Sequence, residues 1–255
     1  MRMILAVMYR EFLIRTTSLT WAFADLIIPL SYLLLFGVGL DRALGAGITA
    51  DGRTVEYNAF FLAGVLSMSG FGFAINTSYG FFVDRDNGIL YEFLTYPMTR
   101  GEFLFGKILF NSVLAIVQAL VTVTLAALFL GIRVKWETAS LILPGVVLGT
   151  AGWFFFLSTF ALRIRRNDMF NTFINLVYFF LMFGSSLFYP VAGLPLALRA
   201  FATINPLTWH TDVLRYITIG VGDTSRVLVE TAAFALFTLV SFFAAVRTLQ
   251  RGILK

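Results

Sequence analysis

The sequence has no cysteine and only one histidine, His210. Disulfide bonds, thiol chemistry and metal sites built from cysteines or several histidines are therefore excluded. Charged residues are also scarce: they make up 13% of the 255 residues, whereas about 25% is typical of a soluble domain. Hydrophobic residues make up 59%, which is more than a soluble fold of this size can bury. The composition excludes a soluble enzyme and a nucleic-acid-binding protein, and it predicts an integral membrane protein.

Six long stretches carry almost no charge, and each can form a helix of the roughly 20 residues that cross a bilayer. The first contains Asp25, and the last contains Glu230 near its start. The predicted spans are residues 21–40, 58–82, 107–131, 139–162, 169–189 and 227–247. We therefore expect an all-α integral membrane protein with six transmembrane helices, in a single transmembrane domain over residues 1–255.

The basic residues predict the orientation of these spans. With the N-terminus inside, 12 of the 19 Lys and Arg residues fall on the inner side. Inner loops of membrane proteins carry an excess of Lys and Arg, so both termini are expected to be cytoplasmic in a multi-pass protein of the cell membrane. The net charge of +5 suits contact with the anionic lipids of the inner leaflet.

Residues 1–20 carry too much charge to span the membrane. A helix here would be amphipathic, and we expect it to lie at the inner membrane interface. Its apolar face is formed by Leu5, Tyr9 and Phe12. Its charged face is formed by Arg10, Glu11 and Arg15.

Three small-residue patterns predict local structure. Asp51-Gly52, between two short β-prone runs, predicts a hairpin within residues 48–55. Gly145 and Gly149 lie four residues apart on the fourth span and predict a close helix contact. Gly106 likewise predicts close packing at the start of the third span.

The run from Gly101 to Lys107 begins like a phosphate-binding loop. Ile108 stands where a hydroxyl would hold magnesium, and the run opens a membrane helix instead of following a strand. Nucleotide binding is therefore not expected here, and Lys107 is expected to extend its ammonium group to the membrane interface.

Two features leave other functions open. Asp25 lies inside a predicted span and could carry a proton in a secondary transporter, or it could pair with a basic residue of the N-terminal helix. Ser185 and Ser186, with His210, could suggest an intramembrane protease. Prolines separate His210 from both serines, so no helix face relates them, and we expect no catalytic site in this chain.

The segment 83–101, between the second and third spans, is the most informative part of the chain. It starts with polar residues, continues as a short helix over 89–94, and is ended by Pro97. A short charged helix on the inner face suits docking of a soluble partner. Its candidate contact residues are Asp84, Arg85, Asp86, Gly88, Glu92, Tyr96, Pro97 and Arg100.

This segment resembles the signature of type-2 ABC transporter permeases, which export polysaccharides, lipid-linked sugars and drugs. In that family a polar stretch precedes a hydrophobic pair, a proline, a hydroxyl residue and an arginine, and a Gly-Lys pair then opens the third span. The matching positions are Glu92, Phe93, Leu94, Pro97, Met98, Thr99, Arg100, Gly106 and Lys107. A second match is the Asn-Pro pair and the later arginine before the last span: Asn205, Pro206 and Arg215.

The resemblance implies one permease subunit of an ATP-driven exporter of an amphipathic or lipid-linked substrate. Two copies of the chain would pair as a homodimer within membrane lipids, and two copies of a separate ABC ATPase would bind ATP and Mg. Residues 83–101 would form the coupling loop, flanked by Tyr9, Arg10, Glu11 and Arg15 of the interfacial helix. Residues 190–226 would form short re-entrant helices at the outer face. The chain itself would hold no cofactor and no metal.

Overall fold

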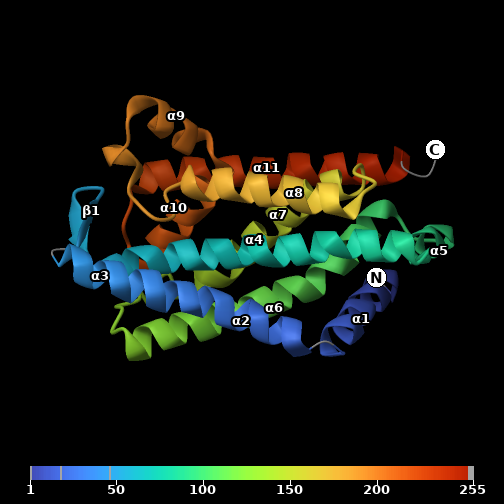
Figure 1. Cartoon of the computed structure of the whole chain (residues 1–255), viewed down its shortest axis with the longest axis horizontal. Helices are drawn as coiled ribbons and strands as arrows, with labels where there is room; N and C mark the ends of the chain where they lie inside the picture. Colours follow the sequence, from blue (N-terminus) through green and yellow to red (C-terminus); the bar gives the residue numbers. More distant parts are fainter. Residues whose placement is uncertain (1, 18, 46, 252–255) are drawn as a thin grey trace.

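The computed structural model describes residues 2–17, 19–45 and 47–251 as an all-α membrane protein (Figure 1). Residues 1, 18 and 252–255, which belong to the predicted 1–20 helix and 1–255 domain, lie outside this range. The first half of the chain forms α1 (Arg2–Thr16), α2 (Leu19–Tyr32), η1 (Leu33–Val38), α3 (Gly39–Leu44), β1 (Ile48–Ala50), β2 (Arg53–Val55), α4 (Tyr57–Asp86), α5 (Ile89–Thr95) and α6 (Arg100–Phe129). The second half forms η2 (Ala139–Leu141), α7 (Ile142–Ala161), α8 (Asn167–Phe183), η3 (Val191–Gly193), α9 (Leu196–Ile204), α10 (Pro206–Ile219) and α11 (Thr224–Arg251).

Five helices are long and apolar enough to cross a membrane, among the residues that the structure describes. They cover Phe23–Leu44, Tyr57–Asp86, Arg100–Phe129, Ala139–Ala161 and Thr224–Arg251. These five helices match five of the predicted spans. The remaining predicted span, 169–189, corresponds to α8, whose 17 residues give a helix of about 26 Å.

The helix α8 ends at Phe183, six residues before the predicted boundary, because polar groups take over its last carbonyls. The hydroxyl of Ser185 donates to the carbonyl of Met182 at 2.7 Å. The amide of Asn205 donates to the carbonyls of Leu181 and Gly184, at 2.8 and 2.9 Å. These bonds satisfy acceptors that the helix leaves free at its C-terminus.

The bundle has two distinct ends (Figure 1). At one end, called the α5 end below, lie α1, α5 and the last turns of α11. At the other, called the hairpin end, lie the β1–β2 hairpin, α9 and α10. The hairpin pairs Ile48 with Val55 and turns at Asp51-Gly52, both with positive φ, which confirms the predicted turn.

The centre of the bundle is α4, which packs most extensively on α7. Glycines on α7 bring its neighbours close. A Cβ built on Gly149 would overlap the ring of His210 on α10, and one on Gly152 would lie 2.5 Å from the hydroxyl of Thr238 on α11. The predicted close contact at the Gly145–Gly149 pair is therefore confirmed, and it lies within the chain.

We predict that Gly149→Ala destabilises the protein by about 1–3 kcal/mol, because the added methyl overlaps an imidazole that cannot move aside easily. Hydrogen bonds to the hydroxyl of Ser67 and to the carbonyl of Gly145 hold that ring. The measurement is Tm in detergent, with Gly72→Ala as control because a Cβ on Gly72 meets nothing within 4 Å. An equal Tm for the two variants would contradict this packing.

Candidate functional site

The N-terminal helix α1 turns its charged face inward and its apolar face outward. Leu5, Tyr9 and Phe12 are exposed, as suits a helix at the lipid interface. On the inner side Val7 is fully buried against α6. A Cβ on Gly106 would lie 2.6 Å from the Cβ of Val7, so this glycine permits the close approach that the sequence predicts.

Three buried charged side chains and the half-buried Arg10, from α1, α4 and α6, meet at the α5 end. The ammonium of Lys107 lies 2.9 Å from a carboxylate oxygen of Glu11 and 2.7 Å from one of Asp84. The guanidinium of Arg10 also binds Asp84, and it reaches Glu11 at 3.3 Å. We call these four residues the inner charge cluster.

Three members of the inner charge cluster are almost inaccessible to water, whereas Arg10 is half-buried. Lys107 is 1% exposed, Asp84 2% and Glu11 7%. The rings of Phe81 and Phe103 lie 5.2 and 5.8 Å from the ammonium of Lys107. The expectation that Lys107 reaches the interface is therefore wrong: its two carboxylate partners are close enough to hold it inside the bundle, where charge-assisted hydrogen bonds are strong.

The connection from α4 to α6 places α5 at the tip of the α5 end (Figure 1). Gly88 precedes α5 with φ of 73°, a conformation that glycine adopts without strain. After Pro97, Thr99 and Glu102 form a reciprocal capping box that starts α6, whose first residue is Arg100. Two breaks in the helix thus reverse the chain between the membrane helices.

The predicted coupling residues have different surroundings. Asp84 lies inside the bundle, as described above. Arg85 donates to the carbonyls of Ile164 and Arg165, at 3.1 and 2.8 Å, and so binds the end of α4 to the α7–α8 loop. The exposed members of the set are Asp86, Gly88, Glu92, Tyr96 and Pro97, and Arg100 is half-buried. A contact role for these residues remains a prediction.

Asp25 lies beside the inner charge cluster, and both of its carboxylate oxygens accept hydrogen bonds. One oxygen accepts from Arg15 at 2.9 Å, and the other accepts from the amide of Asn76 at 2.9 Å. Arg15 also reaches the side chain of Asn111, at 3.4 Å. These contacts match the expected pairing of Asp25 with a basic residue of the N-terminal helix.

A cavity of about 650 Å³ opens beside the inner charge cluster. It is lined from α1, α4, α6 and α8, so it lies where the N-terminal helix meets the bundle. Beyond the cluster, its polar lining consists of neutral amides and two hydroxyls together with one further arginine. These are Arg15, Asn76, Thr77, Tyr79, Asn111 and Asn171.

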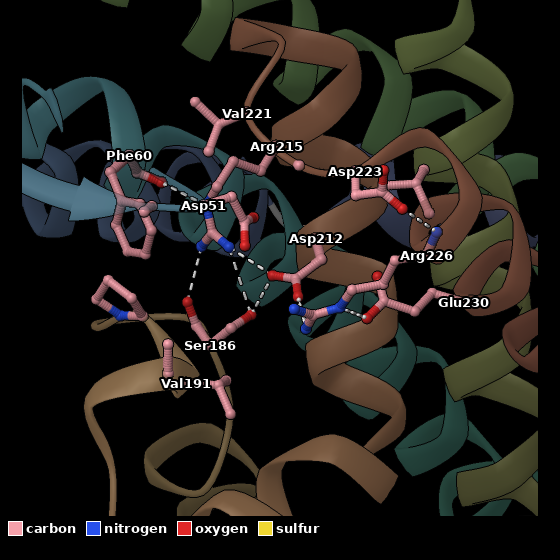
Figure 2. A pocket seen from close by; sticks show the side chains of 15 residues that line it. Asp51, Phe60, Ser186, Val191, Asp212, Arg215, Val221, Asp223, Arg226 and Glu230 are labelled. Carbon is pink, nitrogen blue, oxygen red and sulfur yellow. Dashed lines mark hydrogen bonds and ion pairs between the residues drawn. The ribbon is translucent and has the colours of Figure 1, made fainter. Parts of the chain in front are cut away.

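At the hairpin end, Asn205 and Arg215 hold the segment that follows α8. Asn205 accepts from the backbone N–H of Leu207 and so caps α10, in which Pro206 occupies the first turn. Arg215 is 4% exposed and donates to the carbonyl of Ser186 at 2.7 Å (Figure 2). Its guanidinium lies 3.8 Å from the ring centre of Phe60 on α4.

The protease alternative finds no matching geometry. His210 binds the hydroxyl of Ser67 at 2.7 Å, whereas Ser186 donates to Asp212 and Ser185 to a backbone carbonyl. Burial lowers the pKa of His210, in α10 outside the candidate spans, to about 4, so its imidazole is neutral. Within the described ranges, no three His, Asp or Glu side chains are grouped to hold a metal ion.

Comparison with known proteins identifies the class. Residues 2–219 match the family model of the ABC-2 type transporter. The chain is 28% identical over 196 residues to a transport permease, ycf38, of Porphyra purpurea, covering 76% of this chain and 66% of that one. It is 25% identical over 247 residues to nodulation protein J of Rhizobium leguminosarum bv. trifolii, covering 94% and 92%. The chain thus spans just under two thirds of the ycf38 relative.

The chain therefore belongs to the ABC-2 type transporter family, as its motifs predict. Together with its apolar helices, this membership makes the chain a multi-pass membrane protein of the transport permease class. In such a family the membrane subunit is non-catalytic.

The sequence did not predict that Glu11 and Lys107 contact Asp84. The three residues lie far apart in the chain, so no local pattern indicates their contact.

We predict that Lys107→Met lowers stability by about 3–5 kcal/mol, because the two buried acids Glu11 and Asp84 would then share the half-buried Arg10 as their one cation in the inner charge cluster. Thermal unfolding in detergent measures the effect. The matched control is Lys135→Met: this lysine is partly exposed and 4.0 Å from an exposed acid, so its loss should cost less than about 1 kcal/mol. Similar losses in both variants would show that the inner charge cluster does not stabilise the fold.

Proposed function

We propose that this chain is the membrane subunit of an ATP-driven exporter whose ATPase is a separate subunit, present in two copies. The observation that carries the proposal is the position of α5, which projects at the tip of the α5 end between two long membrane helices (Figure 1). Its exposed charge and rings suit a groove on a soluble protein. The export direction rests on the resemblance to type-2 permeases.

A displacement of α5 would be transmitted directly to the membrane helices. The backbone joins α5 to α4 on one side and to α6 on the other. The inner charge cluster then ties both helices to α1 through Arg10 and Glu11. In this proposal the exposed Glu92, Tyr96 and Pro97 contact the ATPase, while Asp84 transmits their displacement. ATP and Mg would be bound by the partner.

We propose six membrane crossings, with α8 as the one that falls short of full span length. It runs along the bundle between its two ends (Figure 1). The start of α1 and the end of α11 lie at the same end, as an even number of crossings requires. That end would face the cytoplasmic side of the cell membrane. With nine and 14 residues, α9 and α10 are too short to span and would be the re-entrant pair.

A second copy of the chain would pack against α8. This helix makes few contacts with the rest of its own chain, and it exposes Met169, Leu176 and Phe180. The inner cavity reaches the same helix through Asn171. A homodimer closed over this face would enclose a path between the two copies. An amphipathic or lipid-linked substrate would enter it from the inner leaflet.

We predict that Glu92→Arg abolishes export of the substrate, because the reversed charge on α5 would disrupt its contact with the ATPase. The direct readout is co-purification of a soluble P-loop ATPase with the tagged chain from its own host. Glu137→Arg is the control, since this exposed acid lies near the hairpin end. Its ATPase recovery should equal that of the unchanged protein.

Two results would count against the proposal. One is equal recovery of the ATPase with Glu92→Arg in a well-folded preparation. The other is transport that survives ATP depletion and is lost in Asp25→Asn, which would favour the proton-coupled alternative. Because Asp25 is held by Arg15 and Asn76, we do not expect the second result.

A further inference from the structure

A pocket at the hairpin end gathers side chains from separate parts of the chain (Figure 2). The turn of the hairpin contributes Asp51, and the segment after α8 contributes Ser186. The helix α10 and the turn that follows it add acids and an arginine, and α11 adds another pair. These are Asp212, Arg215, Asp223, Arg226 and Glu230.

The pocket holds more acid than base: four acidic side chains face two arginines. Both arginines are already engaged. Arg215 donates to Asp212 at 2.5 Å, and Arg226 donates to Asp212 at 2.9 Å and to Glu230 at 2.8 Å. Asp51 and Asp223 are therefore in excess over the cations of the pocket.

Glu230 carries an unused acceptor at this place. The residue is 7% exposed, and one carboxylate oxygen binds Arg226. The other, Oε2, is buried and has no hydrogen-bond partner among the residues that the structure describes. Asp212 and Asp51 act on the same carboxylate as like charges. A buried charged oxygen without a partner is costly, so the arrangement calls for a cationic donor.

We propose that this pocket binds a protonated amine, whose N–H donates to Oε2 of Glu230. The excess charge of Asp51 and Asp223 would stabilise the bound cation. A metal ion fits less well, because no group of three ligating side chains occurs in the described ranges. An ammonium has three N–H donors, and the carboxylates of Asp51 and Asp223 line the same pocket as further acceptors beside Oε2.

The amine has two conceivable sources with the same chemistry. It is either a free amine on the hairpin side of the membrane, or the amine of a transported molecule that passes the pocket. Binding itself depends on neither the ATPase nor transport. The two sources are therefore separated by a second measurement after binding has been established.

The test is a titration of the purified full chain, in detergent, with dansylcadaverine, followed by fluorescence anisotropy. Its N-acetylated form is the neutral probe. We expect saturable binding of the amine only, and a loss of at least about tenfold in affinity with Glu230→Gln, as for other charge-assisted hydrogen bonds. Glu137→Gln, at an exposed acid near the same end, should bind as the unchanged protein does.

A second variant keeps the test valid if Glu230→Gln folds poorly. Asp51 lies in the exposed hairpin turn with φ of 46°, a conformation that asparagine tolerates. Asp51→Asn removes charge without touching the helices, and we expect affinity to fall about two- to threefold through the weaker field.

Three outcomes would overturn the proposal: no saturable binding, equal binding of the acetylated probe, or unchanged affinity in both variants. If binding is established, retention of the probe is compared in host cells that express the chain or its Glu230→Gln variant. Lower retention with the unchanged chain identifies the amine of a transported molecule. Equal retention identifies a free ligand from outside.

Discussion

Three charged side chains are buried beside the half-buried Arg10. They can stay there only while all four remain in contact, and the rest of the structure depends on this constraint. Lys107 lies between Glu11 and Asp84, and Arg10 closes the set. Removing one member leaves an uncompensated charge in an apolar place. Because the four come from α1, α4 and α6, their contact fixes the N-terminal helix to the two helices that carry α5.

The hairpin end uses the same physics. Arg215 and Arg226 connect α10 to α11 and to the segment after α8. Between the two ends the bundle is held without charge, by glycines such as Gly149 that admit a neighbouring ring and by aromatic contacts such as that of Phe71 with Trp153. The scarce charge of this chain is thus concentrated at both ends, which leaves the middle apolar for lipid and for helix movement.

Local patterns made much of this predictable. Uncharged runs predicted the long helices, Asp51-Gly52 the hairpin, and the spacing of Gly145 and Gly149 the close contact on α7. The pairing of Asp25 with a basic residue of the N-terminal helix was one of two alternatives that the sequence left open, and the partner, Arg15, is ten residues away. Lys107 was misjudged since its partners lie 96 and 23 residues distant, where no local pattern reports them. The end of α8 depends likewise on Asn205, a tertiary contact.

If α5 docks the ATPase as proposed, α1 and α5 move as one body during ATP hydrolysis by that partner. Since the chain has no cysteine, spin labels can be placed at Thr16→Cys on α1 and Thr95→Cys, the last residue of α5. The measurement is the distance between them by pulsed electron paramagnetic resonance, in the ATPase complex diluted with unlabelled chain. We expect the distance between Thr16 and Thr95 within one chain to be the same with and without ATP. In a separate, undiluted sample labelled at Thr95 alone, the distance between the two copies should change. A change between Thr16 and Thr95 within one chain would contradict movement as one body.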